Sequence, residues 1–89
     1  MDRPAAETLA LRALAWAAGN DSLGPFLAAG GLDSAGLRAR AGEPELLAAF
    51  LDFMLSDDRL AGAFCAAESM APEKLHAARR ALPGAPPEN

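Results

Sequence analysis

Residues 44–56 are the stretch that most constrains what this chain can fold into. They read PELLAAFLDFMLS and carry charge only at Glu45 and Asp52, which lie seven residues apart. A helix that is apolar nearly all round has to bury more than one of its faces. Pro44 suits a first helical position, because the N–H that proline lacks would be unpaired there. We therefore predict a central helix over residues 44–56, with the other segments packed around it.

The composition favours helices over strands and limits the size of the core. The chain has 89 residues, is rich in Ala and Leu, and contains no Tyr and one Cys. Ala and Leu are strong helix formers, and 89 residues allow one small domain. We expect a single helical domain over residues 1–84 and a disordered Pro-rich tail over residues 85–89.

Helix start and stop signals divide the rest of the chain into five more helical segments. Each segment either begins with proline or follows a short polar residue, and glycine or a polar residue follows most of them. Ser22 and its two polar predecessors are expected to cap the second helix, Asp33 the third and Asp57 the fifth. The expected helices outside the central one cover residues 4–18, 23–29, 34–41, 58–68 and 72–82. The predicted fold is an all-α, compact bundle of five or six short helices.

An internal repeat is suggested by a shift of 38 positions. This shift places Phe26 on Phe64 and Leu32 on Met70, and Leu37 falls on Leu75. Each half would then consist of a long helix and two shorter ones that bury their faces against the other half. An Ala-rich chain also produces such matches by chance, so both interpretations stay open.

Charge and hydropathy limit the class of partner and the cellular compartment that we expect for this chain. The formal net charge of −4 makes nucleic acid a poor default partner, because phosphate binding needs a cationic surface. A secretory signal begins with a basic segment followed by an apolar run. The start of this sequence does not show that pattern, so we expect no secretory signal. The apolar runs are too short to span a bilayer. We expect a cytoplasmic protein that does not enter a membrane.

No group of residues has the spacing of a catalytic or metal site. Cys65 and His76 are the only residues of their types, and no pair shows zinc-ligand spacing. We expect Cys65 to be a small buried or half-buried apolar residue, with Glu68 raising its pKa if anything. His76 is expected on the solvent side of the last helix. The chain is therefore predicted to be no enzyme and to carry no cofactor and no metal.

The leading functional hypothesis is a non-catalytic protein-interaction or adaptor module. The first helix, with Leu9, Leu14 and Trp16, is the place where an exposed groove or a self-association face is expected, because Trp is enriched at interface hot spots. The partner would be an unknown protein or a second copy of the chain. The alternative for Trp16 is that it fills the core against Phe50 and Phe53.

A second hypothesis is weak nucleic-acid binding through two arginine clusters. Arg38 and Arg40 end the third helix, and Arg79 and Arg80 end the last. Cations at helix C-termini are also what the helix dipole favours. The second and third helices together have the size of a helix-turn-helix, and the two clusters could form one basic face.

The order of these signals resembles an uncharacterised family of small helical bacterial proteins, classed as a domain of unknown function. The matching stretches are ETLALRALAW at residues 7–16, Phe26-Leu27 through Gly31-Leu32-Asp33, and FLDFML at residues 50–55 followed by Asp58. The resemblance covers nearly the whole chain except the tail. It implies an all-helical single domain and no activity, cofactor or catalytic residue.

Overall fold

The computed structural model describes residues 1–83, and these form an all-α fold. No strand occurs among them, which confirms the predicted fold class. The expected tail at residues 85–89 lies outside the described residues. The helices are α1 (Arg3–Gly19), α2 (Gly24–Gly30), α3 (Ser34–Arg40), α4 (Pro44–Leu55), α5 (Asp58–Ala67) and α6 (Pro72–Arg80). No helix of residues 1–83 is long and apolar enough to cross a membrane.

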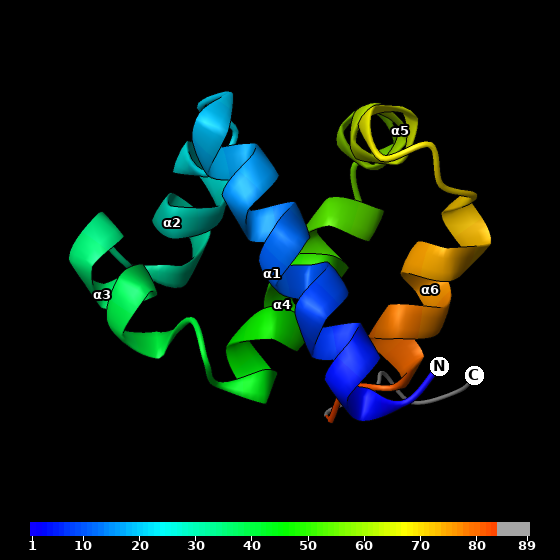
Figure 1. The fold of residues 1–89 in the computed structure, drawn as a ribbon. Helices are drawn as coiled ribbons and strands as arrows, with labels where there is room; N and C mark the ends of the chain where they lie inside the picture. Colours follow the sequence, from blue (N-terminus) through cyan, green and yellow to red (C-terminus); the bar gives the residue numbers. More distant parts are fainter. Residues whose placement is uncertain (84–89) are drawn as a thin grey trace.

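Helix α4 lies at the centre of the bundle, as its apolar sequence predicts. Helix α1 crosses α4, and α6 packs against both of them, while α5 covers another side of α4 (Figure 1). The buried residues of α4 point in several directions around its axis, and only a narrow stripe that includes Asp52 stays exposed. They are Leu46, Leu47, Ala48, Phe50, Leu51 and Met54.

Helix α1 meets its neighbours through a stripe of small side chains. Ala6, Ala10, Ala13 and Ala17 recur at helical spacing and are fully buried. Methyl groups at these positions let the axes of packed helices come close, because the distance between axes depends on the side chains at the contact. The longest helix of the described chain can therefore lie directly against α4 and α6.

Two aromatic clusters hold different parts of the bundle together. Phe26 of α2 packs edge-on against Phe50 of α4, with ring centroids 5.1 Å apart, and lies 5.4 Å from Phe53. Trp16 instead pairs with Phe64 of α5, at 5.4 Å and an interplanar angle of 58°. The expectation that Trp16 packs against Phe50 and Phe53 is therefore wrong. Phe26 takes that place, because its ring reaches both Phe50 and Phe53 of α4 from α2.

Aspartate side chains begin three of the helices. Asp2, Asp33 and Asp57 each accept hydrogen bonds from backbone N–H groups in the first turn of the helix that follows. These bonds pair N–H groups that have no partner inside a helix. The predicted caps at Asp33 and Asp57 are confirmed. The expected polar cap of α2 is wrong, because Leu23 occupies that position and makes no side-chain capping bond.

The turns that follow α2 and α5 have the same geometry, 38 residues apart. Gly31 and Ser69 both take positive φ angles, of 65° and 53°. After each turn, an N–H group bonds back across it: Leu32 to the Leu27 carbonyl and Met70 to the Cys65 carbonyl, both at 2.9 Å. The surroundings differ, because α6 packs on α1 and α4 while α3 lies at the outer edge (Figure 1). The predicted repeat is thus matched in the turns and not in the packing.

Candidate functional site

A mostly apolar groove runs between α1 and α3. It has a volume of about 440 Å³. This volume is within the usual range of ligand pockets, about 300–1,000 Å³. Its walls come from α1, from the turn after α1 and from α3. The lining residues are Leu11, Leu14, Ala15, Ala18, Leu23, Ser34, Leu37, Arg38 and Ala41.

Local sequence explains why this groove stays open. Helix α3 has seven residues and buries one of them, Leu37, so a single side chain anchors it to the core. On the facing side of α1, Ala15 and Ala18 are small and exposed and leave the space unfilled. Leu14 forms part of the floor, and Leu11 stands at the groove with 43% of its surface exposed. Large apolar side chains and small ones together thus produce a hollow with an apolar lining.

Among residues 1–83, Arg38 is the only charged residue that lines the groove. Its side chain is exposed in the last turn of α3, and it forms no salt bridge within the described part of the chain. Asp33, at the other end of α3, is occupied as the N-cap, because its Oδ1 accepts the Gly36 N–H at 2.7 Å. The groove therefore combines an apolar lining with one positive charge on an acidic protein.

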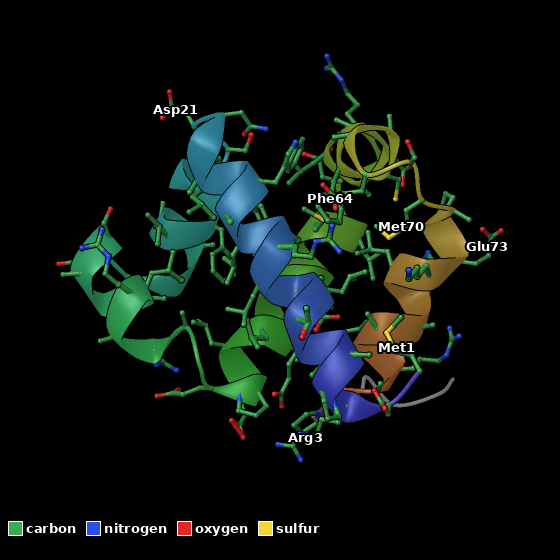
Figure 2. The ribbon with its side chains drawn as sticks, in the orientation of Figure 1. Met1, Arg3, Asp21, Phe64, Met70 and Glu73 are labelled. Atoms are coloured by element: carbon green, nitrogen blue, oxygen red, sulfur yellow. The ribbon has the colours of Figure 1, made fainter. Side chains whose placement is uncertain are left out.

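The structure separates the three residues that were expected at a protein interface. Leu9 and Leu14 belong to the core, with 8% and 6% of their surfaces exposed. Trp16 is half-buried against Phe64, a buried residue of α5 that is labelled in Figure 2. Of the three, only Leu14 reaches the groove. Sequence reasoning missed Leu11, although its place one residue after the buried Ala10 puts it on the outer face of the helix.

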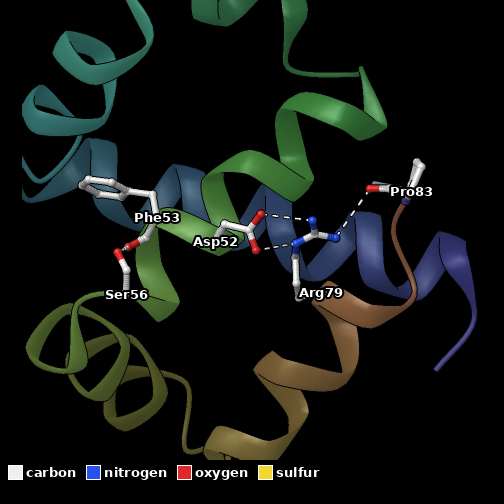
Figure 3. Close-up of polar contacts among 5 residues, drawn as sticks. All are labelled: Asp52, Phe53, Ser56, Arg79 and Pro83. Carbon is white, nitrogen blue, oxygen red and sulfur yellow. Dashed lines mark hydrogen bonds and ion pairs between the residues drawn. The ribbon is translucent and has the colours of Figure 1, made fainter. Parts of the chain in front are cut away.

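Arg79 is a structural residue, which corrects its place among the candidate nucleic-acid contacts. Its side chain is 6% exposed and donates two hydrogen bonds to Asp52, Nε to Oδ1 at 2.6 Å and Nη2 to Oδ2 at 3.0 Å (Figure 3). Its Nη1 also donates to the Pro83 carbonyl at 3.5 Å. Such a two-pronged pair fixes both partners. Arg79 therefore ties α6 to α4 and is not available to a phosphate.

The remaining arginines do not form one basic face. Arg38 and Arg40 lie on α3 and Arg80 on α6, and these helices stand on opposite sides of the α1–α4 pair (Figure 1). Arg40 is also paired with Glu43, at 3.0 Å between Nε and Oε1. Within the described residues, the expected positive surface is reduced to the exposed side of α3.

Cys65 and His76 occupy the settings that their sequence contexts predict. Cys65 is buried, and burial raises the pKa of its thiol, which keeps the thiol protonated at neutral pH. The carboxylate that adds to this rise in pKa is Glu73 at the start of α6 (Figure 2). The expected one, Glu68, instead forms an ion pair with Arg12 at 2.9 Å. His76 is exposed on α6.

Two other hollows, of about 500 and 410 Å³, lie at the far end of α1 and are lined by residues of α1, α2, α4, α5 and the turns between helices. They share Ser22, Asp57 and Leu60, and Trp16 borders one of them. Asp57 is already engaged as the N-cap of α5, and Asp21 projects outward from the tip of α1 (Figure 2). Within residues 1–83, no three His, Cys, Asp or Glu side chains are placed to hold a metal ion.

The chain matches the model of a known protein family over most of its length. A family model described as "Protein of unknown function (DUF3572)" matches residues 3–85. Neither the curated proteins nor the solved structures contain a match to this chain. The matched residues include all six helices and every residue that lines the α1–α3 groove.

Proposed function

We propose that this chain, which belongs to the DUF3572 family of proteins of unknown function, is a non-catalytic protein-interaction module that binds its partner in the α1–α3 groove. The observation that carries the proposal is the exposed apolar lining of that groove, with Leu11 at its edge. Apolar grooves between helices are a common way to bind a helical segment of another protein.

The arrangement of reactive side chains supports a non-catalytic role. Burial and the nearby carboxylate of Glu73 keep the Cys65 thiol protonated, so this residue is a poor nucleophile. His76 lies exposed on α6, and neither residue lines the groove. The single buried cysteine also suits the reducing cytoplasm, which is the compartment that we propose.

Nucleic-acid binding has less support than partner binding. It rests on Arg38 and Arg40 of α3, because Arg79 is held by Asp52. Helix α3 is seven residues long, and the net charge of the chain is −4. A mobility-shift assay at low salt tests this alternative directly. A shift that is lost in an Arg38→Ala, Arg40→Ala variant would favour it over the groove.

The proposed function is tested by blocking the groove with one substitution. Ala15 is exposed and lines the groove, so Ala15→Arg fills the hollow without disturbing the core. Ala66→Arg adds the same charge at an exposed position of α5, outside the groove, and serves as the matched control. Tagged wild-type protein and both variants are used to capture partners from cells that express the chain, with quantification by mass spectrometry.

The expected result is a protein retained by the wild type and by Ala66→Arg, and lost with Ala15→Arg. Retention at high salt is expected as well, because apolar contacts are not screened by ions. Equal capture by all three proteins would contradict the proposed docking site. Failure to retain any protein in stoichiometric amount would contradict the interaction function itself.

A further inference from the structure

We infer that the occupant of the α1–α3 groove is a short amphipathic helix of another protein that carries an acidic residue beside its apolar face. The inference rests on the proposed function and names the chemistry of the partner. Three features of the structure carry it: the length of the groove, the charge of Arg38, and the ion pairs around Leu11.

The length of the groove fits about two turns of helix. On α1 it runs from Leu11 to Ala18, a distance of roughly 10 Å at about 1.5 Å per residue. An amphipathic helix of two turns presents apolar side chains at spacings of three and four residues. A segment of this size fills the hollow, whereas a stable interface between whole folded proteins buries about 800 Å² on each side.

The charge of the groove selects an acidic partner segment. Arg38 is exposed, lines the groove and forms no salt bridge within residues 1–83. The other end of α3 offers no competing carboxylate, because Asp33 is engaged with the Gly36 N–H. A guanidinium group at the edge of an apolar surface is well placed to form paired hydrogen bonds with a carboxylate. A carboxylate on the bound helix therefore completes the site.

A second copy of the chain fits the same groove poorly. Leu11 and Met1 are the exposed large apolar side chains among the described residues, so Leu11 is the one on α1 that a second copy could insert. The residue beside Leu11 is the cation Arg12, which is paired with Glu68. The carboxylate one turn away, Glu7, is paired with Arg3 at 3.2 Å. An inserted Leu11 would thus bring no free carboxylate to Arg38.

A displayed library of helical peptides tests this chemistry while the partner itself is unidentified. The peptides have about 14 residues, near the shortest length at which isolated helices form in water, and their apolar and flanking positions are randomised. The library is selected on the wild-type protein. The affinities of the selected peptides are then measured for the wild type and for Ala15→Arg, Arg38→Glu and Arg80→Glu.

The variants are chosen so that each result has one meaning. Arg38 and Arg80 are both exposed and both lie in the last turn of a helix, so Arg80→Glu matches the charge change of Arg38→Glu outside the groove. Circular dichroism of each variant verifies the helical fold before affinities are compared. Sedimentation velocity of the wild type and of Ala15→Arg measures the oligomeric state.

The expected peptides carry an Asp or Glu next to apolar residues spaced three or four apart. Ala15→Arg and Arg38→Glu are each expected to weaken their binding by about tenfold or more, and Arg80→Glu to leave it unchanged. Replacing the acidic residue of a selected peptide by Lys should restore binding to Arg38→Glu, because the pair is then reversed.

Three outcomes would overturn the inference. Peptides that need the groove but show no acidic preference and no charge reversal would refute the acidic occupant and leave the proposed function standing. A wild-type dimer that Ala15→Arg dissociates would replace the partner helix by a second copy. Selected peptides that bind Ala15→Arg with the same affinity as the wild type would refute the proposed occupant. Equal capture of a partner by wild type and Ala15→Arg is a separate result, and it would refute the proposed function.

Discussion

At the scale of single residues, the ion pair between Asp52 and Arg79 is unequal. The Arg79 side chain is 6% exposed and that of Asp52 is 47% exposed. Water can therefore solvate Asp52 when its partner is removed, whereas the guanidinium group of Arg79 stays buried. The cost of breaking such a pair depends on which partner is removed, because a buried charge that loses its counterion is more costly than an exposed one.

We expect Asp52→Asn to lower the free energy of unfolding by about 1–3 kcal/mol, because it removes a charged hydrogen-bond partner from a buried cation. Arg79→Met keeps most of the apolar stem and should cost less. Urea denaturation followed by circular dichroism measures both, and the double variant completes the thermodynamic cycle. A larger loss for Arg79→Met than for Asp52→Asn would show that the burial of Arg79 does not govern this contact.

The thiol of Cys65 should be slow to react and should contribute to stability in a pH-dependent way. Burial, with a further contribution from Glu73, raises its pKa above the ordinary value of 9.0. Alkylation by iodoacetamide at pH 8 should be at least about tenfold slower in the folded protein than in urea, since access and thiolate fraction both fall.

The sign of the pH dependence of stability follows from the raised pKa of Cys65. The folded state holds the thiol proton more tightly than the unfolded state, so the stabilising contribution is complete below pH 9.0 and is lost as the pH rises above it. Cys65→Ala removes this contribution. As the pH rises above 9.0, the wild type should therefore lose stability faster than Cys65→Ala, which urea denaturation at a series of pH values measures. If the free energies of unfolding of the two proteins change with pH in parallel, the predicted link between the Cys65 proton and stability is refuted.

At the scale of helices, the turns after α2 and α5 use different residues for one backbone shape. Gly31 and Ser69 both lie at positive φ. Glycine adopts this conformation without steric cost, whereas a residue with a Cβ atom is destabilised by about 1 kcal/mol. The two turns should therefore respond in opposite directions to the exchange of side chains.

We expect Gly31→Ala to lower the stability by about 1 kcal/mol and Ser69→Gly to raise it by about 0.5–1 kcal/mol. An added Cβ at Gly31 meets no atom within 4 Å, so the effect of Gly31→Ala comes from the backbone alone. Thermal denaturation of both variants and of the wild type checks the signs. A gain in stability for Gly31→Ala would mean that the turn does not hold the left-handed conformation.

Helix positions were well predicted because their signals are local. Aspartate N-caps place the starts of α3 and α5 at the predicted residues. Prolines in the first turn do the same for α4 and α6. Most of the other bounds differ by one residue, and the C-terminal end of α6 by two. The cap of α2 was missed because Asn20, Asp21 and Ser22 lie in the turn after α1, where the Ser22 N–H bonds to the Ala17 carbonyl.

At the scale of the whole molecule, Phe50 connects the central helix to the rest of the core. It is fully buried and packs against Phe26 of α2. Phe50→Ala should lower the free energy of unfolding by about 3–5 kcal/mol, as expected for a buried aromatic residue. Phe50→Leu, which leaves a smaller cavity, keeps the test usable if Phe50→Ala does not fold.

The same variants test whether the helices unfold together. Circular dichroism reports on all helices, and the fluorescence of Trp16 reports on its contact with Phe64, which belongs to a different aromatic cluster from Phe50. If one core joins the six helices, both signals should change at the same urea concentration. A destabilisation by Phe50→Ala of less than about 1 kcal/mol, or separate transitions of the two signals, would contradict this arrangement.

The candidate site was only partly visible in the sequence. The first helix was expected to carry an exposed face, and the groove does lie along it, with Leu14 on its floor. Leu37 and Arg38 join the groove through the position of α3 against α1, and this depends on the angle of a short helix that is anchored by one buried side chain. The burial of Arg79 was not predictable from the sequence either, because its partner Asp52 is 27 residues away along the chain.

By itself, the sequence determined which segments are helical and that residues 44–55 lie at the centre. These properties follow from local capping signals, from helix propensity and from the number of apolar residues that one helix must bury. Only the tertiary structure decided which aromatic residue meets Trp16, which arginine is buried, and where the surface stays open. These features depend on how helices cross, and crossing is set by contacts between residues far apart in the chain.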